Sequence, residues 1–244
     1  MAASGSPAPG RRFQGRIAVI AGASRGLGAA VAEALAREGA QVVLVARTQG
    51  ALEAVDDRIR KIGGDKAVLA PFDLTDFARI DLLGQAVHQR FGRLDILYAG
   101  AATLPPLSPL GHIDPKHWDQ AITVNLTAQW RLVRSLDPLL RLSDAGRAVF
   151  VTAQQGREAT AYWGAYAVAK AGLEALARIY AAEVAHTKVR VNLYDPGPFR
   201  SRLRTQAFPG EDPGVLPDPA SLTGPVLDLL DPACTKHGEL VKGA

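Results

Sequence analysis

The sequence predicts a single α/β domain in which helices cover both faces of a doubly wound parallel sheet. Short runs rich in Val, Ile and Leu alternate along the chain with stretches whose apolar residues recur every three to four positions. Each run is apolar almost throughout, as expected for strands that are covered on both sides. The chain of 244 residues, 48% of them hydrophobic, is long enough for one large core, and no linker divides it.

The alternation begins near residue 16 and continues to the end of the chain. The expected strands cover residues 16–21, 41–46, 66–71, 94–98, 147–152, 188–194 and 239–241. The expected helices cover residues 27–38, 48–62, 76–91, 115–141 and 161–185. Repeated strand, helix and parallel strand form βαβ units, and such sheets bind ligands at the carboxyl ends of their strands.

Two segments depart from the alternation. Residues 1–13 are rich in Ala, Ser, Gly and Pro and lack the apolar core of a secretion signal, so we expect a disordered tail before a domain over residues 14–244. From about residue 197 to 219 the pattern lapses into Pro, Gly and Arg. Long loops in compact domains tend to be lids, so we expect a substrate lid there; the alternative is a surface loop without a function.

Composition excludes several classes of function. The 28 Lys and Arg nearly balance 24 Asp and Glu, and a net charge of +4 is too diffuse to indicate nucleic acid. The single cysteine, Cys234, excludes an internal disulfide and fits a reducing compartment. The five histidines show no metal-ligand spacing, so we expect no metal. No apolar run is long enough to cross a bilayer, so we expect a cytoplasmic protein without a membrane partner.

The first strand runs directly into a glycine-rich turn, AGASRGLG, which opens the first helix. The candidate residues of this turn are Gly22, Ser24, Arg25, Gly26, Leu27 and Gly28. Glycines let the backbone turn tightly and approach a pyrophosphate, and the helix N-terminus offers free N–H groups. This position in a first βαβ unit predicts a dinucleotide site of the Rossmann type. The alternative is a glycine turn that serves packing alone.

The end of the second strand indicates which dinucleotide is bound. The segment VVLVART places Ala46 and Arg47 where a binder of the free ribose 2′-hydroxyl usually presents a carboxylate. An arginine instead pairs bidentately with a phosphate, and Arg25 could supply a second cation to the same group. The pair favours NADP(H) over NAD(H), although either arginine alone could be an ordinary surface residue.

A tyrosine and a lysine form the candidate catalytic pair. Tyr166 and Lys170 in YAVAK are four residues apart on an expected helix and therefore share one face. An ammonium near a phenol favours the phenolate and lowers a pKa that is ordinarily about 10. Tyr166 is thus the candidate acid or base, although Tyr and Lys at this spacing are common on helices.

With AGASRGLG and YAVAK together, the sequence resembles the short-chain dehydrogenase/reductase family from about residue 15 to the end. The resemblance implies interconversion of a carbonyl and a secondary alcohol, with Tyr166 transferring the proton and Lys170 also binding the nicotinamide ribose. It implies that Asn125 of VNL holds a water in the proton relay. It further implies cofactor contacts by Asp73, Gly100, Pro196, Gly197 and Ser201. Members of the family form homodimers or homotetramers, so we expect one of these assemblies.

The sequence departs from the family pattern at two places. A serine that normally bonds the substrate oxygen lies thirteen residues before the tyrosine, which here is Ala153. We expect Thr152 to supply the hydroxyl if the strand end is twisted or bulged, with Gln154 as a further donor. The family's NNAG appears as LYAG, in which Tyr98 replaces an asparagine that ties neighbouring strands together.

Two functions are compatible with these residues. The first is an NADP(H)-dependent oxidoreductase that acts on a small-molecule carbonyl or alcohol, with Tyr166 and Lys170 as the proton-transfer pair. The second is a dinucleotide-binding protein with weak or no catalytic activity and a structural or sensing role. The absence of the usual serine at Ala153 favours the second, because the loss of one donor to a developing oxyanion typically costs about 10² to 10³ in rate.

Overall fold

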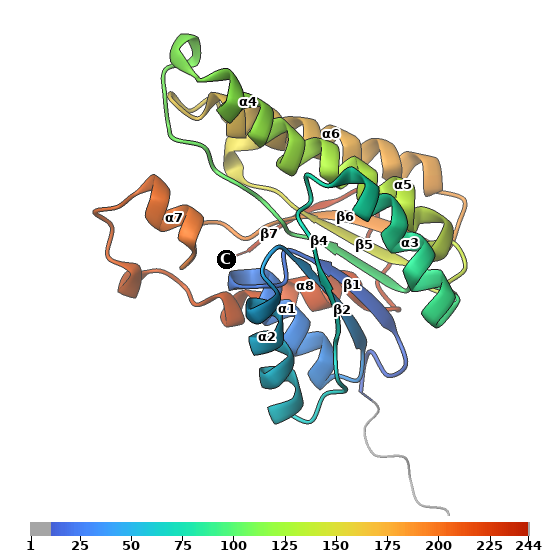
Figure 1. Cartoon of the computed structure of the whole chain (residues 1–244). Coiled ribbons are helices and arrows are strands. Elements are labelled where there is room, and N and C mark those ends of the chain that lie inside the picture. The colour runs from blue at the N-terminus through green and yellow to red at the C-terminus, as the bar shows by residue number, and fades with distance from the viewer. Residues whose placement is uncertain (1–10, 244) are drawn as a thin grey trace, which may run out of the picture.

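A computed structural model describes residues 11–243 and contains one seven-stranded parallel sheet (Figure 1). The strand order is β3-β2-β1-β4-β5-β6-β7. The strands are β1 (Ile17–Ala21), β2 (Gln41–Ala46), β3 (Val68–Pro71), β4 (Ile96–Ala99), β5 (Arg147–Val151), β6 (Arg190–Asp195) and β7 (Leu240–Lys242). The predicted fold class and the seven predicted strands are confirmed, with ends that differ by a few residues.

Helices cover both faces of the sheet. They are α1 (Gly26–Arg37), α2 (Gln49–Lys61), α3 (Phe77–Phe91), α4 (Pro115–Ile122), α5 (Ala128–Leu140), α6 (Gly164–Val184), α7 (Arg202–Ala207) and α8 (Thr223–Leu230). Figure 1 shows α3, α5 and α6 on one face and α1, α2 and α8 on the other, and each face has its own apolar core. The chain changes faces between β3 and β4, beside β1, which is where such sheets bind ligands.

The long helix predicted over residues 115–141 is interrupted. A π-helical turn, Thr123–Thr127, separates α4 from α5. Both polar atoms of the Asn125 side chain, which lies in this turn, bond the backbone of Thr103 on the loop after β4. Apolar periodicity does not reveal such a turn, because it depends on a contact with a distant loop.

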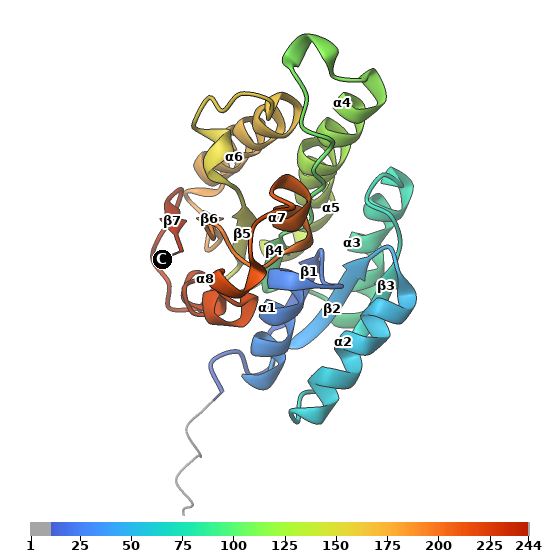
Figure 2. The same cartoon turned by 90° about the vertical axis from the view of Figure 1, so that its left-hand side faces the viewer.

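The C-terminal region contains more helix than the sequence predicted. The expected lid, residues 197–219, includes α7, and α8 follows it. Helix α8 has only eight residues, too few for a clear periodicity, and it is held by four buried side chains that face α1. Figure 2, in which the left-hand side of Figure 1 faces the viewer, shows α7 in front of the strands.

The predicted boundary of the N-terminal tail, after residue 13, is placed too late. Phe13 is fully buried in the core beside α1, and Arg12 pairs with Asp228 and Asp231 near the end of α8. The ordered domain therefore includes residues 11–13, while the rest of the predicted tail, residues 1–10, lies outside the described residues. Within residues 11–243, no helix is both long and apolar enough to cross a membrane.

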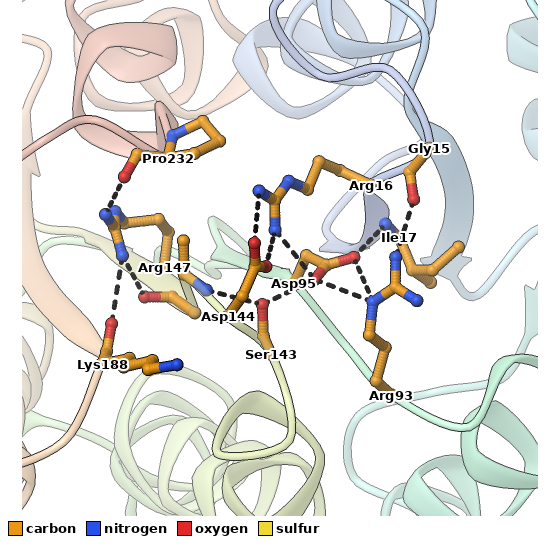
Figure 3. Close-up of polar contacts among 12 residues, drawn as sticks. Gly15, Arg16, Ile17, Arg93, Asp95, Ser143, Asp144, Arg147, Lys188 and Pro232 are labelled. Atoms are coloured by element: carbon orange, nitrogen blue, oxygen red, sulfur yellow. Dashed lines mark hydrogen bonds and ion pairs between the residues drawn. The ribbon is translucent and has the colours of Figure 1, made fainter.

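A buried carboxylate organises the amino ends of the central strands (Figure 3). Asp95, which precedes β4, accepts hydrogen bonds from the Ile17 N–H at 2.8 Å and from the Ser143 hydroxyl at 2.6 Å. Its oxygens also receive the guanidinium groups of Arg16 at 3.3 Å and Arg93 at 3.1 Å. This one side chain therefore joins β1, β4 and the loop before β5.

Arg147, at the start of β5, binds the same edge of the sheet to the C-terminal segment. Its guanidinium donates to the backbone carbonyls of Gly146, Lys188, Asp231 and Pro232 (Figure 3). Burial lowers the pKa of this guanidinium below its ordinary value. Together with Asp95, Arg147 stabilises the sheet at the amino ends of its strands. The carboxyl ends, on the opposite side, are left free to form a site.

Replacing Asp95 is expected to destabilise the domain strongly. Asp95→Ala leaves buried donors without an acceptor, so we expect a loss of about 3–5 kcal/mol in the free energy of unfolding. The control is Asp144→Ala, which removes an exposed partner of Arg16 whose side chain is 70% exposed, and we expect a loss below about 1 kcal/mol. Urea-induced unfolding measures both. Equal losses in the two variants would contradict the role given to Asp95.

Candidate active site

A cleft of about 990 Å³ opens at the carboxyl ends of the strands. Its walls come from the segments that follow β1, β2, β3, β4, β5 and β6, together with α6 and α7. The predicted site residues that line it are Gly22, Ser24, Arg25, Gly26, Leu27, Gly28, Arg47, Asp73, Gly100, Thr152, Tyr166, Lys170, Pro196, Gly197 and Ser201. The structure thus brings together, in one cleft, every predicted site residue except Asn125.

The glycine-rich turn forms part of the cleft lining. Gly22 has a φ of +88°, and a Cβ on it would lie 2.8 Å from the backbone of Ala101, after β4. A Cβ on Gly28 would lie 2.3 Å from the Gly22 carbonyl oxygen. No side chain caps the start of α1, so its first N–H groups are free to meet an anion. This combination is what a bound pyrophosphate needs.

Two arginines and one aspartate lie at the rim of the cleft beyond this turn. Arg25 and Arg47 are both exposed, and Arg47 lies 3.7 Å from the Asp73 carboxylate. Asp73 also accepts a hydrogen bond of 2.9 Å from the Thr75 N–H, which fixes its orientation. The rim therefore offers cations for a phosphate next to a carboxylate that can accept from an amino group.

Tyr166 and Lys170 lie together on α6, at the wall of the cleft. They are 9% and 2% exposed, and the Lys170 ammonium is 5.7 Å from the centroid of the tyrosine ring. The ammonium donates a 2.8 Å hydrogen bond to the carbonyl of Val151, at the end of β5. The pair thus shares one face of the helix, as its spacing predicted.

The pKa values of the pair differ from the sequence expectation. Burial raises the pKa of Tyr166 above its ordinary value, and the nearby Asp195 adds to the rise. Burial lowers the pKa of Lys170 to about 8, against the opposing effects of Asp195 and Glu174. In the free protein, the Tyr166 phenol therefore holds its proton. Desolvation of the phenol outweighs the attraction of the Lys170 ammonium, which is hydrogen-bonded to the Val151 carbonyl rather than to the phenol.

The hydroxyl expected from Thr152 does not face the cleft. Thr152 is buried, and its hydroxyl donates a 2.8 Å hydrogen bond to Glu174. Gln154 is exposed and donates to Glu158 at 2.5 Å. Ala153 itself lines the cleft, so a methyl group occupies the place where the family has its serine. The strand end is not twisted enough to exchange the two positions.

Asn125 is completely buried behind the wall of the cleft. Its amide donates to the Thr103 carbonyl at 2.9 Å and accepts from the Thr103 N–H at 2.8 Å. Thr103 lies on the loop after β4 that lines the cleft. The side chain therefore fixes a wall of the site, and the relay role implied by the resemblance stays a prediction.

Sequence reasoning missed a charged network close to the candidate catalytic pair. The Arg157 guanidinium pairs with two buried carboxylates, Glu174 on α6 and Asp195 at the end of β6. Asp195 also accepts a 3.0 Å hydrogen bond from the Gly197 N–H. The network joins three distant segments, so no local pattern indicates it, and it fixes the Pro196–Gly197 turn against α6.

The predicted lid contributes an aromatic wall near Tyr166. Trp163 packs edge-on against the Tyr166 ring, with centroids 5.7 Å apart, and the centroid of the Phe208 ring, in the predicted lid, lies 6.1 Å from that of Trp163. The Arg204 guanidinium lies 3.9 Å from the Phe208 centroid and forms two 2.6 Å hydrogen bonds with Glu211. This part of the chain is thus ordered by its own contacts.

Two further contacts set the position of α7. The Gln206 amide donates a 2.7 Å hydrogen bond to the Leu104 carbonyl on the loop after β4, across the cleft. Ser201 caps α7 by accepting from the Arg204 N–H at 3.2 Å. The segment therefore connects two walls of the cleft, and its role as a substrate lid stays a prediction.

Comparison with known proteins identifies the family. The family model for short chain dehydrogenases matches residues 16–212. The chain belongs to the short-chain dehydrogenase/reductase family. Uncharacterized oxidoreductase YciK of Escherichia coli (strain K12) is 35% identical over 209 residues, 85% of this chain and 82% of that protein. The 3-oxoacyl-[acyl-carrier-protein] reductase FabG of the same strain is 30% identical over 204 residues, 84% of this chain and 82% of FabG.

Solved structures of short-chain dehydrogenases and reductases agree with this placement. The structure of Escherichia coli YciK has a TM-score of 0.91 at 33% identity and covers 96% of this chain and 98% of its own. An Escherichia coli CFT073 protein assigned to the short-chain dehydrogenases, solved with NADPH, has a TM-score of 0.91 at 34% identity. It covers 96% of this chain and 99% of its own. The fold of the whole described domain is thus that of this oxidoreductase family.

Lys170 is expected to lower the stability of the free protein at neutral pH. Its pKa of about 8 lies below the ordinary 10.5, so the buried ammonium costs the folded state on the order of 3 kcal/mol below pH 8. This cost falls as the pH rises from about 8 to 10.5, because the unfolded chain there holds a proton that the folded chain has lost. Lys170→Met should therefore be more stable than the parent at pH 7, by an amount that shrinks by pH 10.

Urea-induced unfolding at both pH values tests this expectation. Lys66 is exposed, and Lys66→Met is the control whose difference from the parent should not change with pH. A destabilisation by Lys170→Met that is the same at pH 7 and pH 10 would contradict the desolvation of Lys170.

Proposed function

We propose that this protein is an NADP(H)-dependent oxidoreductase that interconverts a carbonyl and a secondary alcohol. The observation that carries the proposal is the meeting of Tyr166 and Lys170 at the wall of a cleft whose floor is the glycine-rich turn. Membership of an oxidoreductase family supports it. Relatives solved with NADPH and with NADP, at 34% and 33% identity, support the choice of cofactor.

The residues present fit a dinucleotide. A Cβ at Gly22 or Gly28 would clash with the backbone of the protein, so these glycines let the turn close, and the start of α1 has free N–H groups for the pyrophosphate. Arg25 and Arg47 would receive a 2′-phosphate, which is why NADP(H) is favoured over NAD(H). Asp73 would accept from the adenine amino group, while Gly100, Pro196, Gly197 and Ser201 would line the remaining path.

The chemistry of the chain itself is a proton transfer at the Tyr166 hydroxyl. Bound NADPH would supply the two reducing electrons for a carbonyl substrate. Tyr166 holds its proton because its pKa is raised, and it would give that proton to the carbonyl oxygen. The Lys170 ammonium would stabilise the negative charge left on the phenol and would bind the nicotinamide ribose. Asn125 would hold the water of the proton relay, as the family resemblance implies.

A second function is favoured by one specific observation. Ala153 presents a methyl group to the cleft, and the Thr152 hydroxyl is bonded to Glu174. A protein with this arrangement could bind the dinucleotide with weak or no turnover and serve a structural or sensing role. Because one missing donor typically lowers the rate by about 10² to 10³ without preventing cofactor binding, turnover separates the two functions.

The expected homodimer or homotetramer is also a proposal. Trp130 on α5 and Val168 and Ile179 on α6 are exposed, and these are the long helices through which relatives are expected to associate. The exposure of apolar side chains of this size on these two helices supports an interface.

Tyr166→Phe is expected to remove turnover and to retain cofactor binding. The variant keeps the aromatic packing against Trp163 and loses only the hydroxyl that carries the proton. Oxidation of NADPH is followed by its absorbance with a panel of activated carbonyls, and binding of NADPH and NADH is measured by titration. We expect tighter binding of NADPH than of NADH by both proteins. Turnover that survives in the variant would show that Tyr166 is not the proton donor.

Ala153→Ser is expected to raise the turnover number by up to about 100-fold, because it restores a donor at the cleft wall. The NADPH dissociation constant should not change. Ala159→Ser, at an exposed position, is the matched control and should leave turnover as it is. An unchanged rate in Ala153→Ser would indicate that another group already bonds the substrate oxygen, whereas absent turnover in both the parent and this variant would favour the second function.

A further inference from the structure

A tyrosine at the end of β4 has no part in the chemistry proposed above. Tyr98 lies on the central strand, opposite Ile20 of β1 and Val149 of β5. Its side chain is 1% exposed, and yet it belongs to the lining of the cleft. The ring extends along the end of the strand beside Gly100, where a Cβ would lie 2.3 Å from the ring and 2.8 Å from the hydroxyl oxygen. Only the glycine leaves room for this side chain.

The hydroxyl of Tyr98 has no hydrogen-bond partner among residues 11–243. A second buried tyrosine nearby, Tyr194 on β6, donates its hydroxyl to the Leu222 carbonyl at 3.1 Å. Some polar atoms of the described residues, such as the Gln129 amide oxygen, have neither a hydrogen-bond partner nor contact with solvent. The Tyr98 oxygen is not one of them. Tyr98 thus combines a place in the cleft lining with a hydroxyl that has no partner among the described residues.

This position lies beside the path expected for the dinucleotide. Gly100 follows Tyr98 at the end of β4, and the next residue, Ala101, touches the glycine-rich turn at Gly22. The free N–H groups at the start of α1 lie at the same turn. The part of a dinucleotide that meets this turn is its ribose–phosphate backbone, whose oxygens are hydrogen-bond acceptors.

The protonation state of Tyr98 suits a donor. Burial and the neighbouring Tyr194 raise the pKa of the Tyr98 phenol above its ordinary value. The hydroxyl therefore keeps its proton at neutral and moderately alkaline pH. No group among the described residues accepts from this hydroxyl, so an acceptor that arrives at this place replaces solvent as its partner and gains a modest net hydrogen bond.

We propose that Tyr98 is a cofactor-binding residue, whose hydroxyl donates a hydrogen bond to an oxygen of the ribose–phosphate backbone of the bound dinucleotide. The inference rests on the proposed function, because it requires a dinucleotide in the cleft. It adds a residue to the site at a position where the family pattern has an asparagine.

The test is the binding of NADPH by the full chain and by Tyr98→Phe. The variant keeps the ring against Gly100 and removes only the hydroxyl, so we expect an NADPH dissociation constant that is about 3- to 10-fold larger. The melting temperature of the free protein should not fall, because no hydrogen bond within the protein is lost. The increase in melting temperature that saturating NADPH produces should be smaller than in the parent.

Tyr194→Phe is the matched control, since it removes a hydroxyl that does have a protein partner. We expect it to lower the melting temperature of the free protein and to leave the NADPH dissociation constant unchanged. Equal NADPH affinity in the parent and in Tyr98→Phe would overturn the inference and leave the proposed function standing. Absence of NADPH binding by the parent would instead overturn the proposed function, and the inference with it.

Discussion

The cleft depends on the close approach of backbone segments at the ends of β1 and β4. Gly22 meets the backbone of Ala101, and Gly28 meets the carbonyl of Gly22, at distances that leave no space for a Cβ. This approach places the uncapped start of α1 directly at the carboxyl edge of the sheet. The same constraint extends to Gly100, which leaves room for the ring of Tyr98. The site therefore depends on positions occupied by glycine as much as on the polar side chains that line it.

A second constraint is electrostatic. Lys170 is buried, and its nearest carboxylates, Glu174 and Asp195, favour its charged form, while desolvation opposes it. Arg157 lies between the same two carboxylates and neutralises part of their charge. The pKa of Lys170 thus results from a balance among groups on α6, on β6 and on the segment after β5. Such a balance is typical of functional sites, where stability is lost to keep a reactive group in place.

The sequence predicted the parts of the site that depend on local spacing. The glycine-rich turn and the tyrosine–lysine pair were identified because each lies within one short segment of fixed geometry. The π-helical turn at Asn125, helix α8 and the network of Arg157 were not, because each depends on contacts between distant segments. The same holds for Thr152, whose direction is set by Glu174, twenty-two residues further along the chain. The buried position of Phe13 likewise depends on the core beside α1 rather than on the composition around it.

Ala153 and Tyr166 both line the cleft. In the proposed reaction, a serine at position 153 would place a donor beside the substrate oxygen. Without that serine, the proposed proton donor is the phenol of Tyr166, which lies on α6 and packs against Trp163. Burial keeps that phenol protonated in the free protein, which suits the donation of a proton to a carbonyl oxygen more than its removal from an alcohol. The same burial makes the charged phenolate costly, so proton donation would require the Lys170 ammonium, which gives one of its three hydrogens to the Val151 carbonyl, to direct another toward the phenolate oxygen. A bound ribose, which offers Lys170 new acceptors beside Tyr166, would supply the reason for that movement and would make proton transfer depend on an occupied cofactor site.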